Sequence, residues 1–223
     1  GVMRLAREAA QVLAALEQSG ELDNTVVIYT SDNGWQMPRG LANCYDAGSR
    51  VPLAIRWGRH LAAGTRVDAF VNVADLGPTF LELAGVKPPS EMTMHSILPL
   101  LRGEPDSVPR DALFLERERH ANVRHDNQSY PVRAIRTREF LYLRNLRPDR
   151  WPAGDPQVMK KDGTPGPMHE AYFDIDEGPA RNLLVKNPDD AMLGKFLQLA
   201  VAKRPAEELF DVVADPSCLN NLA

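Results

Sequence analysis

Two oxygen-bearing side chains, those of Asp32 and Asn33, directly follow the apolar, β-branched run 25–30. A run of this kind without alternation predicts a buried strand of a parallel α/β sheet. Such sheets hold their chemistry just beyond the carboxyl ends of the strands, and carboxylate and amide oxygens are the ligands that Ca²⁺ and Mg²⁺ prefer. Asn33 followed by Gly34 is also a strong hairpin signal. From these residues alone, a plain turn and a metal-binding loop are both open.

Helices and strands alternate around this motif. Apolar residues at helical spacing predict an amphipathic helix over residues 1–20. Further strands are expected at 51–57 and 70–73, followed by a helix at 75–84 with Asp75 as a possible cap. A short helical turn is expected at 96–102. This order predicts an αβ step of a doubly wound sheet.

A proline- and glycine-rich stretch then interrupts the pattern. We expect one domain over residues 1–103, a linker at 104–110 and a second domain over 111–223. The second domain is predicted to contain antiparallel strands at 112–116, 132–137 and 140–144, an irregular stretch at 148–167, a helix near 189–203 and a last strand at 209–212. It is therefore a smaller α+β domain.

Composition limits the function classes. The 223 residues are 43% hydrophobic and 25% charged with a net charge of −4, which is typical of a soluble globular protein and argues against nucleic-acid binding. No apolar run approaches the length of a membrane span. Cys44 and Cys218 provide no disulfide framework and lack metal-site spacing, so buried thiols are expected. Nine arginines between Arg117 and Arg150 could bind sulfate, phosphate or carboxylate, or form a solvated surface.

Residues 30–57 resemble the second metal-binding region of the sulfatase family. Three further stretches, 73–85, 96–103 and 208–223, match the family in the same order, so that the resemblance covers essentially the whole chain. It is greatest to the branch that contains heparan N-sulfatase. The resemblance implies an α/β fold, namely the C-terminal part of an alkaline-phosphatase-like doubly wound sheet plus the smaller antiparallel-sheet domain.

The resemblance also implies cofactors. Asp32 and Asn33 match the family positions that complete a divalent cation site, usually Ca²⁺. The family nucleophile is a formylglycine made from the first residue of a Cys-x-Pro-x-Arg or Ser-x-Pro-x-Arg motif. Neither Cys44 nor Cys218 stands in such a motif. We therefore expect a C-terminal part of a sulfatase whose nucleophile belongs to a missing N-terminal segment, and we expect this part alone to be inactive.

Four further residues are implied in the substrate pocket. The family has a Lys or Arg eight or nine residues after the Asp-Asn pair, where this chain has Leu41; Arg39 is the candidate replacement as a catalytic and sulfate-binding group. His120 could bind a sugar hydroxyl or protonate a leaving amine or alcohol. Arg124 and Arg133 are further substrate-binding candidates, with Arg133 expected to support the pocket from behind. A surface arginine and a packed histidine are the plainer alternatives.

Three functional hypotheses follow. The first is hydrolysis of a sulfate ester or sulfamate on a sulfated carbohydrate, for which the family suggests a periplasmic or secreted location. The second is phosphoryl or phosphonate hydrolysis by the same fold. The third is a carbohydrate-binding protein without catalysis, which the loss of the family cation at Leu41 mildly favours. The particular glycan and the oligomeric state remain open.

Overall fold

In the computed structural model, which describes residues 2–104 and 110–223, the chain forms two units. The first unit contains residues 1–30 and 52–110, and the second contains residues 31–51 and 111–223. One boundary between the units lies between residues 110 and 111, at the end of the stretch 104–110 that was expected to be a linker. Residues 105–109 of that stretch lie outside the described residues. The sequence did not predict that residues 31–51, which carry Asp32 and Asn33, would belong to the second unit.

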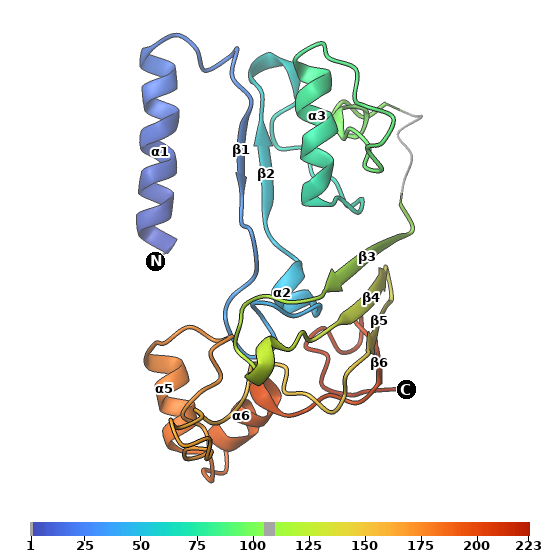
Figure 1. The fold of residues 1–223 in the computed structure, drawn as a ribbon. Helices are drawn as coiled ribbons and strands as arrows, with labels where there is room; N and C mark the ends of the chain where they lie inside the picture. Colours follow the sequence, from blue (N-terminus) through green and yellow to red (C-terminus); the bar gives the residue numbers. More distant parts are fainter. Residues whose placement is uncertain (1, 105–109) are drawn as a thin grey trace. The chain divides into compact units, whose positions relative to one another are not determined.

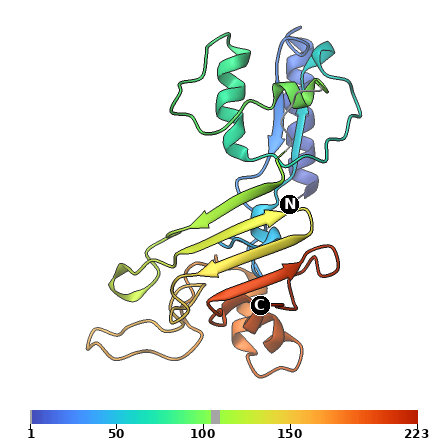
Figure 2. The same cartoon turned by 90° about the vertical axis from the view of Figure 1, so that its right-hand side faces the viewer.

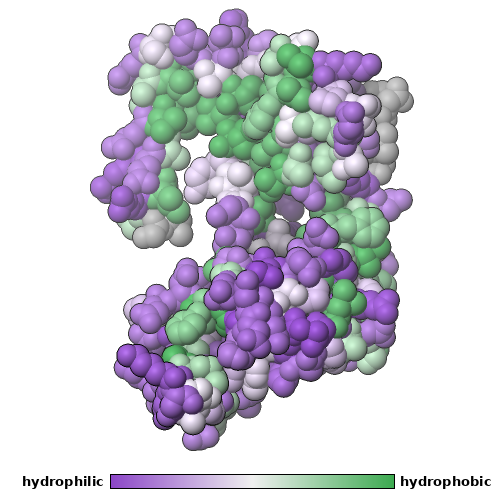
Figure 3. All heavy atoms as spheres, in the orientation of Figure 1, coloured by the Kyte–Doolittle hydropathy of each residue, from purple (hydrophilic) through white to green (hydrophobic). Residues whose placement is uncertain are grey.

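The first unit begins with helix α1 (Val2–Gln18), as predicted. Gly20 ends this segment with a φ of 76°, a conformation that glycine adopts without steric cost. Strands β1 (Val27–Thr30) and β2 (Leu53–Arg56) then form a two-stranded sheet (Figure 1). Figure 3 shows hydrophobic residues gathered on this unit, over β1, β2 and the side of α1 that faces them.

The pairing of β1 with β2 differs from the parallel arrangement expected for residues 25–30. The two strands are antiparallel, with Ile28 opposite Ile55. The chain leaves the unit after Thr30 and re-enters it at Pro52, and the Thr30 hydroxyl donates a 2.8 Å hydrogen bond to the Pro52 carbonyl. Because the segment 31–51 starts and ends at the same end of the sheet, β2 runs antiparallel to β1.

The helical part of the first unit contains η1 (Gly58–His60), η2 (Val73–Asp75), α3 (Leu76–Leu83) and α4 (Leu98–Leu101). The predicted strand at 70–73 is absent, because the chain enters a capped helix there. Asn72 is the cap: its side chain accepts from Ala74 N, and Asp75 accepts from Asn72 N at 2.8 Å. Asp75 does occupy the N-cap position of α3, as predicted, but its side chain makes no capping bond to α3 and is instead the reciprocal partner in the capping box of η2.

The second unit is built on a four-stranded antiparallel sheet in the order β3-β4-β5-β6 (Figure 2). The strands are β3 (Ala112–Arg117), β4 (Val132–Thr137), β5 (Phe140–Asn145) and β6 (Glu207–Asp211). All four agree with the predicted strands to within two residues. The core on one face of the sheet includes Leu141, Leu143 and Phe210, together with Cys44 and Tyr45 from the segment 31–51, which also forms α2 (Asp46–Ser49).

Two helices, α5 (Pro179–Lys186) and α6 (Leu193–Val201), enclose a second core with Tyr172 and Leu197 at its centre. The sequence missed α5 and predicted α6 too long. Asp190 explains the later start of α6, because its carboxylate accepts from the N–H groups of Met192 and Leu193 at 2.9 and 2.8 Å. A residue that caps the helix in this way cannot lie inside it.

No helix in the described ranges is both long enough and apolar enough to cross a membrane.

Candidate active site

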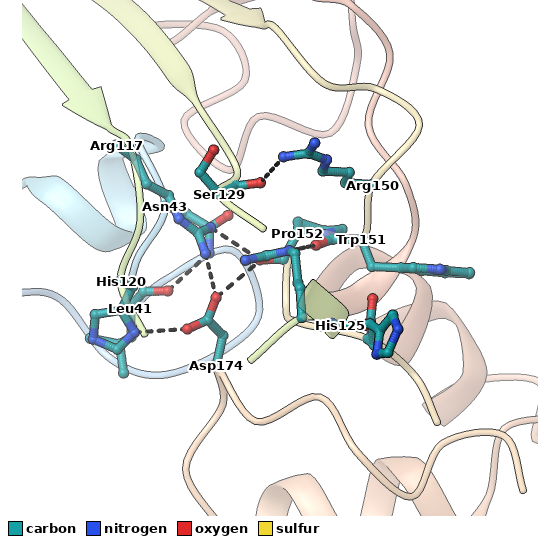
Figure 4. Close-up of polar contacts among 12 residues, drawn as sticks. Leu41, Asn43, Arg117, His120, His125, Ser129, Arg150, Trp151, Pro152 and Asp174 are labelled. Atoms are coloured by element: carbon teal, nitrogen blue, oxygen red, sulfur yellow. Dashed lines mark hydrogen bonds and ion pairs between the residues drawn. The ribbon is translucent and has the colours of Figure 1, made fainter. Parts of the chain in front are cut away.

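A buried carboxylate, that of Asp174, joins three side chains of the second unit (Figure 4). Its Oδ1 is 2.9 Å from Nδ1 of His120. Its Oδ2 accepts a hydrogen bond from Arg117, and Nη2 of Arg124 lies 3.4 Å away. Two of the predicted site residues, His120 and Arg124, are thus brought together by an acid that the sequence analysis did not single out.

Sheet edges and loops explain this convergence. Arg117 is the last residue of β3, and His120 and Arg124 lie on the loop that leads to the 3-10 helix η3 (His125–Asn127). Both guanidinium groups lie over the ring of Tyr130, at 5.1 Å from its centroid. They also donate hydrogen bonds to the backbone carbonyls of the 151–152 segment. The arginines are therefore fixed by protein groups on several sides.

The electrostatics of the cluster are those of a buried ion pair with one extra cation. Arg117 and Arg124 are 7% and 5% exposed, and burial lowers the pKa of each guanidinium. For Arg124, repulsion by Arg117 lowers the pKa further. Arginine nevertheless stays charged in proteins, so that two positive charges face the single carboxylate. Burial also raises the pKa of Tyr130, to about 12.

His120 is the accessible member of the cluster. Its side chain is 42% exposed, whereas the side chains of Asp174 and Arg124 are 2% and 1% exposed. Nδ1 faces the buried carboxylate, and Nε2 lies on the opposite side of the ring. The site can therefore exchange a proton or a hydrogen bond with a ligand through His120, while Arg124 acts from within the protein.

The loop that follows Asp32 and Asn33 borders the same place. Arg39, Leu41, Asn43 and Asp174 line one small cavity of the second unit. The loop turns sharply: Leu41 N donates to Trp35 O at 2.8 Å, and Asn43 Nδ2 donates to Leu41 O at 2.9 Å. A Cβ on Gly40 would lie 1.7 Å from Trp35 O, so glycine is required at this close approach.

Arg39 points into the unit. Its guanidinium donates to the carbonyl of Cys218, lies 4.7 Å from the centroid of the Tyr45 ring and is 4.0 Å from a carboxylate oxygen of Glu208. These contacts hold the loop against the C-terminal strand. They describe a structural role, and the predicted contact of Arg39 with a sulfate group stays a prediction.

Asp32 and Asn33 lie in a bend one residue after the end of β1, with Asp32 exposed and Asn33 partly buried. Asp32 Oδ1 accepts a hydrogen bond from Asn33 N at 3.0 Å, and Asn33 Nδ2 donates one to Gly34 O at 2.7 Å. Because Nδ2 faces Gly34, the side-chain oxygen of Asn33 lies on the opposite side of the amide group. These hard oxygens fit Ca²⁺ or Mg²⁺. Within the described parts of the chain, no group of three or more His, Cys, Asp or Glu side chains could hold a metal. The pair can therefore supply only part of a coordination sphere.

Arg133 approaches the Asp174 cluster through the backbone of the neighbouring strand, since its Nη1 donates to the carbonyl of Arg117 at 3.2 Å. It is on β4 opposite Glu116, and its guanidinium is 3.0 Å from Glu118 and 3.6 Å from Glu116. The three side chains are 45–77% exposed, so this is a surface ion-pair network. The predicted supporting role of Arg133 in the pocket stays a prediction.

Asp174 and Arg117 are the site residues that sequence reasoning missed. Asp174 stands in the stretch Ala171-Tyr-Phe-Asp-Ile175, where its neighbours are apolar. An acid inside such a stretch is rarely buried without a cationic partner, and this is the signal that could have found it. Arg117 carried no signal beyond its place in an arginine-rich segment.

Comparison with known proteins defines the class. Residues 8–86 match the family model described as Sulfatase. An ulvan-active sulfatase of Formosa agariphila is 29% identical over 97% of this chain and 32% of its own length. Human N-sulphoglucosamine sulphohydrolase is 33% identical over 65% of this chain and 30% of its own length.

Solved structures agree. BT4656, determined in complex with its substrate D-glucosamine-2-N,6-O-disulfate, superposes with a TM-score of 0.62 and 25% identity over 99% of this chain and 34% of its own. A phosphonate monoester hydrolase of Agrobacterium radiobacter shares the fold, with a TM-score of 0.59 and 21% identity over 96% of this chain and 34% of its own.

Residues 8–86 carry the sulfatase family domain, the relatives of the chain include sulfatases, and its α/β fold is that of the alkaline-phosphatase-like sulfatases. Both the family and the fold class predicted from the sequence are thereby confirmed. The chain spans about a third of the length of the curated relatives and solved structures that it matches.

Proposed function

We propose that the intact protein containing this chain hydrolyses sulfate esters or sulfamates on a sulfated sugar. One observation carries the proposal: the loop that follows Asp32 and Asn33 and the carboxylate bonded to His120 line the same cavity. The loop that follows the family motif and the carboxylate that binds His120 are thus neighbours in one unit. Relatives that act on sulfated sugars, among them N-sulphoglucosamine sulphohydrolase, support the choice of substrate class.

The roles within this chain follow from exposure and charge. Asp32 and Asn33 would provide oxygen ligands to one divalent cation, Ca²⁺ by family resemblance. Such a cation, when bound, holds oxygens of the transferred group and offsets their charge. Neither Cys44 nor Cys218 lies in the required motif, whereas Ser129-Tyr-Pro-Val-Arg133 has the Ser-x-Pro-x-Arg spacing. Tyr130 and Val132 of that stretch are packed in the core of the four-stranded sheet, so we assign the nucleophile to another segment of the intact protein. His120, the exposed residue of the Asp174 cluster, would contact the sugar next to the scissile bond.

Sulfate release by the intact protein tests this proposal. N-sulfoglucosamine, glucosamine 6-sulfate and an aryl sulfate would be compared, with and without EDTA followed by added Ca²⁺. We expect metal-dependent release from at least one sugar. Asp32→Ala should lower kcat/KM by roughly 100-fold, because several kcal/mol of charge stabilisation depend on the metal site. Absence of sulfate release from every compound by a correctly folded, fully processed protein would refute it.

His125 supplies a matched control. It lies five residues from His120, its side chain is 63% exposed and its ring is 3.4 Å from the exposed carboxylate of Asp126 rather than from Asp174. His125→Gln should leave sulfate release within about twofold of the unmodified protein, as expected for a surface substitution. A loss as large as that expected of His120→Asn would mean that the assay reports folding rather than the site.

A second function has a specific observation in its favour. The phosphonate monoester hydrolase shares the fold over 96% of this chain, and Leu41 lacks the charge that the family uses near the sulfate. A phosphonate monoester and an aryl phosphate therefore belong in the same assay. Higher kcat/KM for the phosphonate would replace the sulfatase proposal, and sugar binding without turnover of any compound would favour the non-catalytic alternative.

A further inference from the structure

The hydrogen bond between His120 and Asp174 determines which ring nitrogen carries the proton. An ionised carboxylate can only accept, so Nδ1 of His120, at 2.9 Å from Oδ1, must be the donor. A neutral imidazole has one N–H, and its other nitrogen is an acceptor. Nε2 of His120 is therefore the acceptor, on the side of the ring away from the buried carboxylate.

The carboxylate of Asp174 cannot turn to release the ring. Asp174 is 3% exposed, and its second oxygen, Oδ2, is engaged by Arg117 and Arg124. These arginines are themselves tied to the carbonyls of Pro152 and Trp151 at 2.7–3.0 Å. A histidine bonded to an acid held in this way has a fixed ring plane, which is what a precise contact with a ligand requires.

The charges around Asp174 show what the acid does for His120. Two guanidinium groups already oppose its single negative charge. Both arginines are on Oδ2, so Oδ1 is left for Nδ1 of His120. The effect of Asp174 on His120 is therefore one of orientation.

We propose that Asp174 is a positioning residue, which holds His120 in the Nδ1-protonated form and presents Nε2 as a hydrogen-bond acceptor to an O–H or N–H group of the sulfated sugar (Figure 4). Asp174 acts through His120 and does not contact the sugar. The inference rests on the proposed function for the identity of the ligand, and on the contacts of Asp174 for the geometry.

Nuclear magnetic resonance of the intact protein with ¹⁵N-labelled histidine tests the geometry without any turnover. We expect the His120 ring to show the Nδ1-protonated pattern at neutral pH, and the Nε2 resonance to shift when N-sulfoglucosamine is added. His125 serves as the internal reference, because its exposed ring should show the mixture of tautomers typical of free histidine. An Nε2-protonated His120, or an Nε2 resonance that no sulfated sugar moves, would overturn the inference.

Two substitutions of His120 separate its two nitrogens. In His120→Asn the amide lies near the position of Nδ1 and can keep the contact with Asp174, whereas in His120→Gln it lies near that of Nε2. We expect His120→Asn to keep the thermal stability and to lower kcat/KM roughly tenfold, mainly through KM, because one substrate hydrogen bond is lost. His120→Gln should also lower kcat/KM, by a smaller factor, because its amide reaches the position of Nε2 but is no longer held by Asp174, and it should lose stability.

The outcomes distinguish this inference from the proposed function. If sulfate is released but His120→Asn is as active as His120→Gln, the positioning role falls and the sulfatase proposal stands. If no sulfate is released but Nε2 of His120 responds to the sugar in the Nδ1-protonated form, the positioning role stands and the proposed reaction falls. His125→Asn and His125→Gln should change neither kcat/KM nor the thermal stability.

Discussion

The hydroxyl of Tyr45 donates a 2.6 Å hydrogen bond to Oε2 of Glu208, and both residues are buried. This bond ties the segment that carries Asp32 and Asn33 to strand β6. Glu208 also lies near Arg39, at 4.0 Å. Burial raises the pKa of Tyr45, so its hydroxyl remains a donor throughout the neutral range.

Replacement of Tyr45 by phenylalanine should lower the free energy of unfolding of the second unit by about 1–3 kcal/mol, because a buried carboxylate loses its donor. Tyr142→Phe is the matched control: Tyr142 donates to Glu207 at 2.8 Å, but that bond is exposed. It should cost less than about 0.5 kcal/mol. Urea unfolding followed by circular dichroism measures both. Equal losses for the two substitutions would contradict the role assigned to Tyr45.

Stability of the first unit should fall in acid through Asp75. Burial by itself raises the pKa of this carboxyl, but hydrogen bonds from Arg110 and from Asn72 N outweigh burial, and the net pKa is lowered below 3.8. A carboxyl with a depressed folded pKa contributes stability that is complete above its ordinary pKa and is lost as the pH falls through the folded value. Asp75→Asn should therefore remove part of the destabilisation measured between pH 4 and pH 2.

The exposed pair Arg66–Asp68 provides the comparison for Asp75, since its two side chains are 85% and 75% exposed. Asp68→Asn should leave the pH dependence of unfolding unchanged, as expected for a solvated ion pair. If Asp75→Asn and Asp68→Asn have the same pH profile, the Asp75–Arg110 contact has no part in acid unfolding.

Neither thiol of this chain should react in the folded protein. Burial raises the pKa of Cys44 to about 11 and that of Cys218 to about 12, and the thiolate is the reactive form. Iodoacetamide at pH 8 should modify both residues only after unfolding, which peptide mass spectrometry can locate. Modification of either residue in the native protein would contradict the burial described for the sheet core.

Glycine at position 48 should be indispensable. A Cβ there would lie 2.2 Å from Gly40 O and 2.6 Å from Asn43 O, both of which are backbone atoms of the loop beside Asp174. Gly48→Ala should destabilise the second unit by about 2 kcal/mol or more and reduce sulfate release, because the loop must move. Thermal unfolding and the sugar-sulfate assay of the intact protein measure these changes.

Gly77→Ala is the opposite case. Gly77 lies within α3, where a Cβ would meet only Met92 Cε at 3.6 Å, an ordinary contact. The substitution should stabilise the first unit by about 0.5–1 kcal/mol through helix propensity. A destabilising Gly77→Ala, or a harmless Gly48→Ala, would show that the backbone approaches described for these glycines are wrong.

Most of the strands and the first helix could be predicted from the sequence because alternation and helical spacing are local signals. The antiparallel partner of β1 could not, since pairing depends on where the chain returns after residues 31–51. Helix α5 was missed because its residues, Pro-Ala-Arg-Asn-Leu-Leu-Val-Lys, mix polar and apolar types over only two turns.

The candidate site could be predicted only in part, because some of its residues stand in local motifs whereas others meet only in the folded chain. Asp32, Asn33, His120 and Arg124 stood in stretches that resemble the family. The link from His120 to Asp174 spans 54 positions and depends on the packing of a loop against the segment before α5. The apolar neighbours of Asp174 indicate a buried acid with a partner, but neither residue type nor spacing identifies His120 as that partner.

The membership of residues 31–51 in the second unit has a consequence for assembly. The chain passes from one unit to the other three times, at 30/31, 51/52 and 110/111. During synthesis, Tyr45 and the Asp-Asn turn are made long before β6, so the second unit cannot close around its core until the last strand has been released. A protein truncated to residues 111–223 would lack Cys44 and Tyr45, and the core of its four-stranded sheet would be incomplete. The second unit is thus built from two stretches of the sequence, with residues 52–110 of the first unit between them.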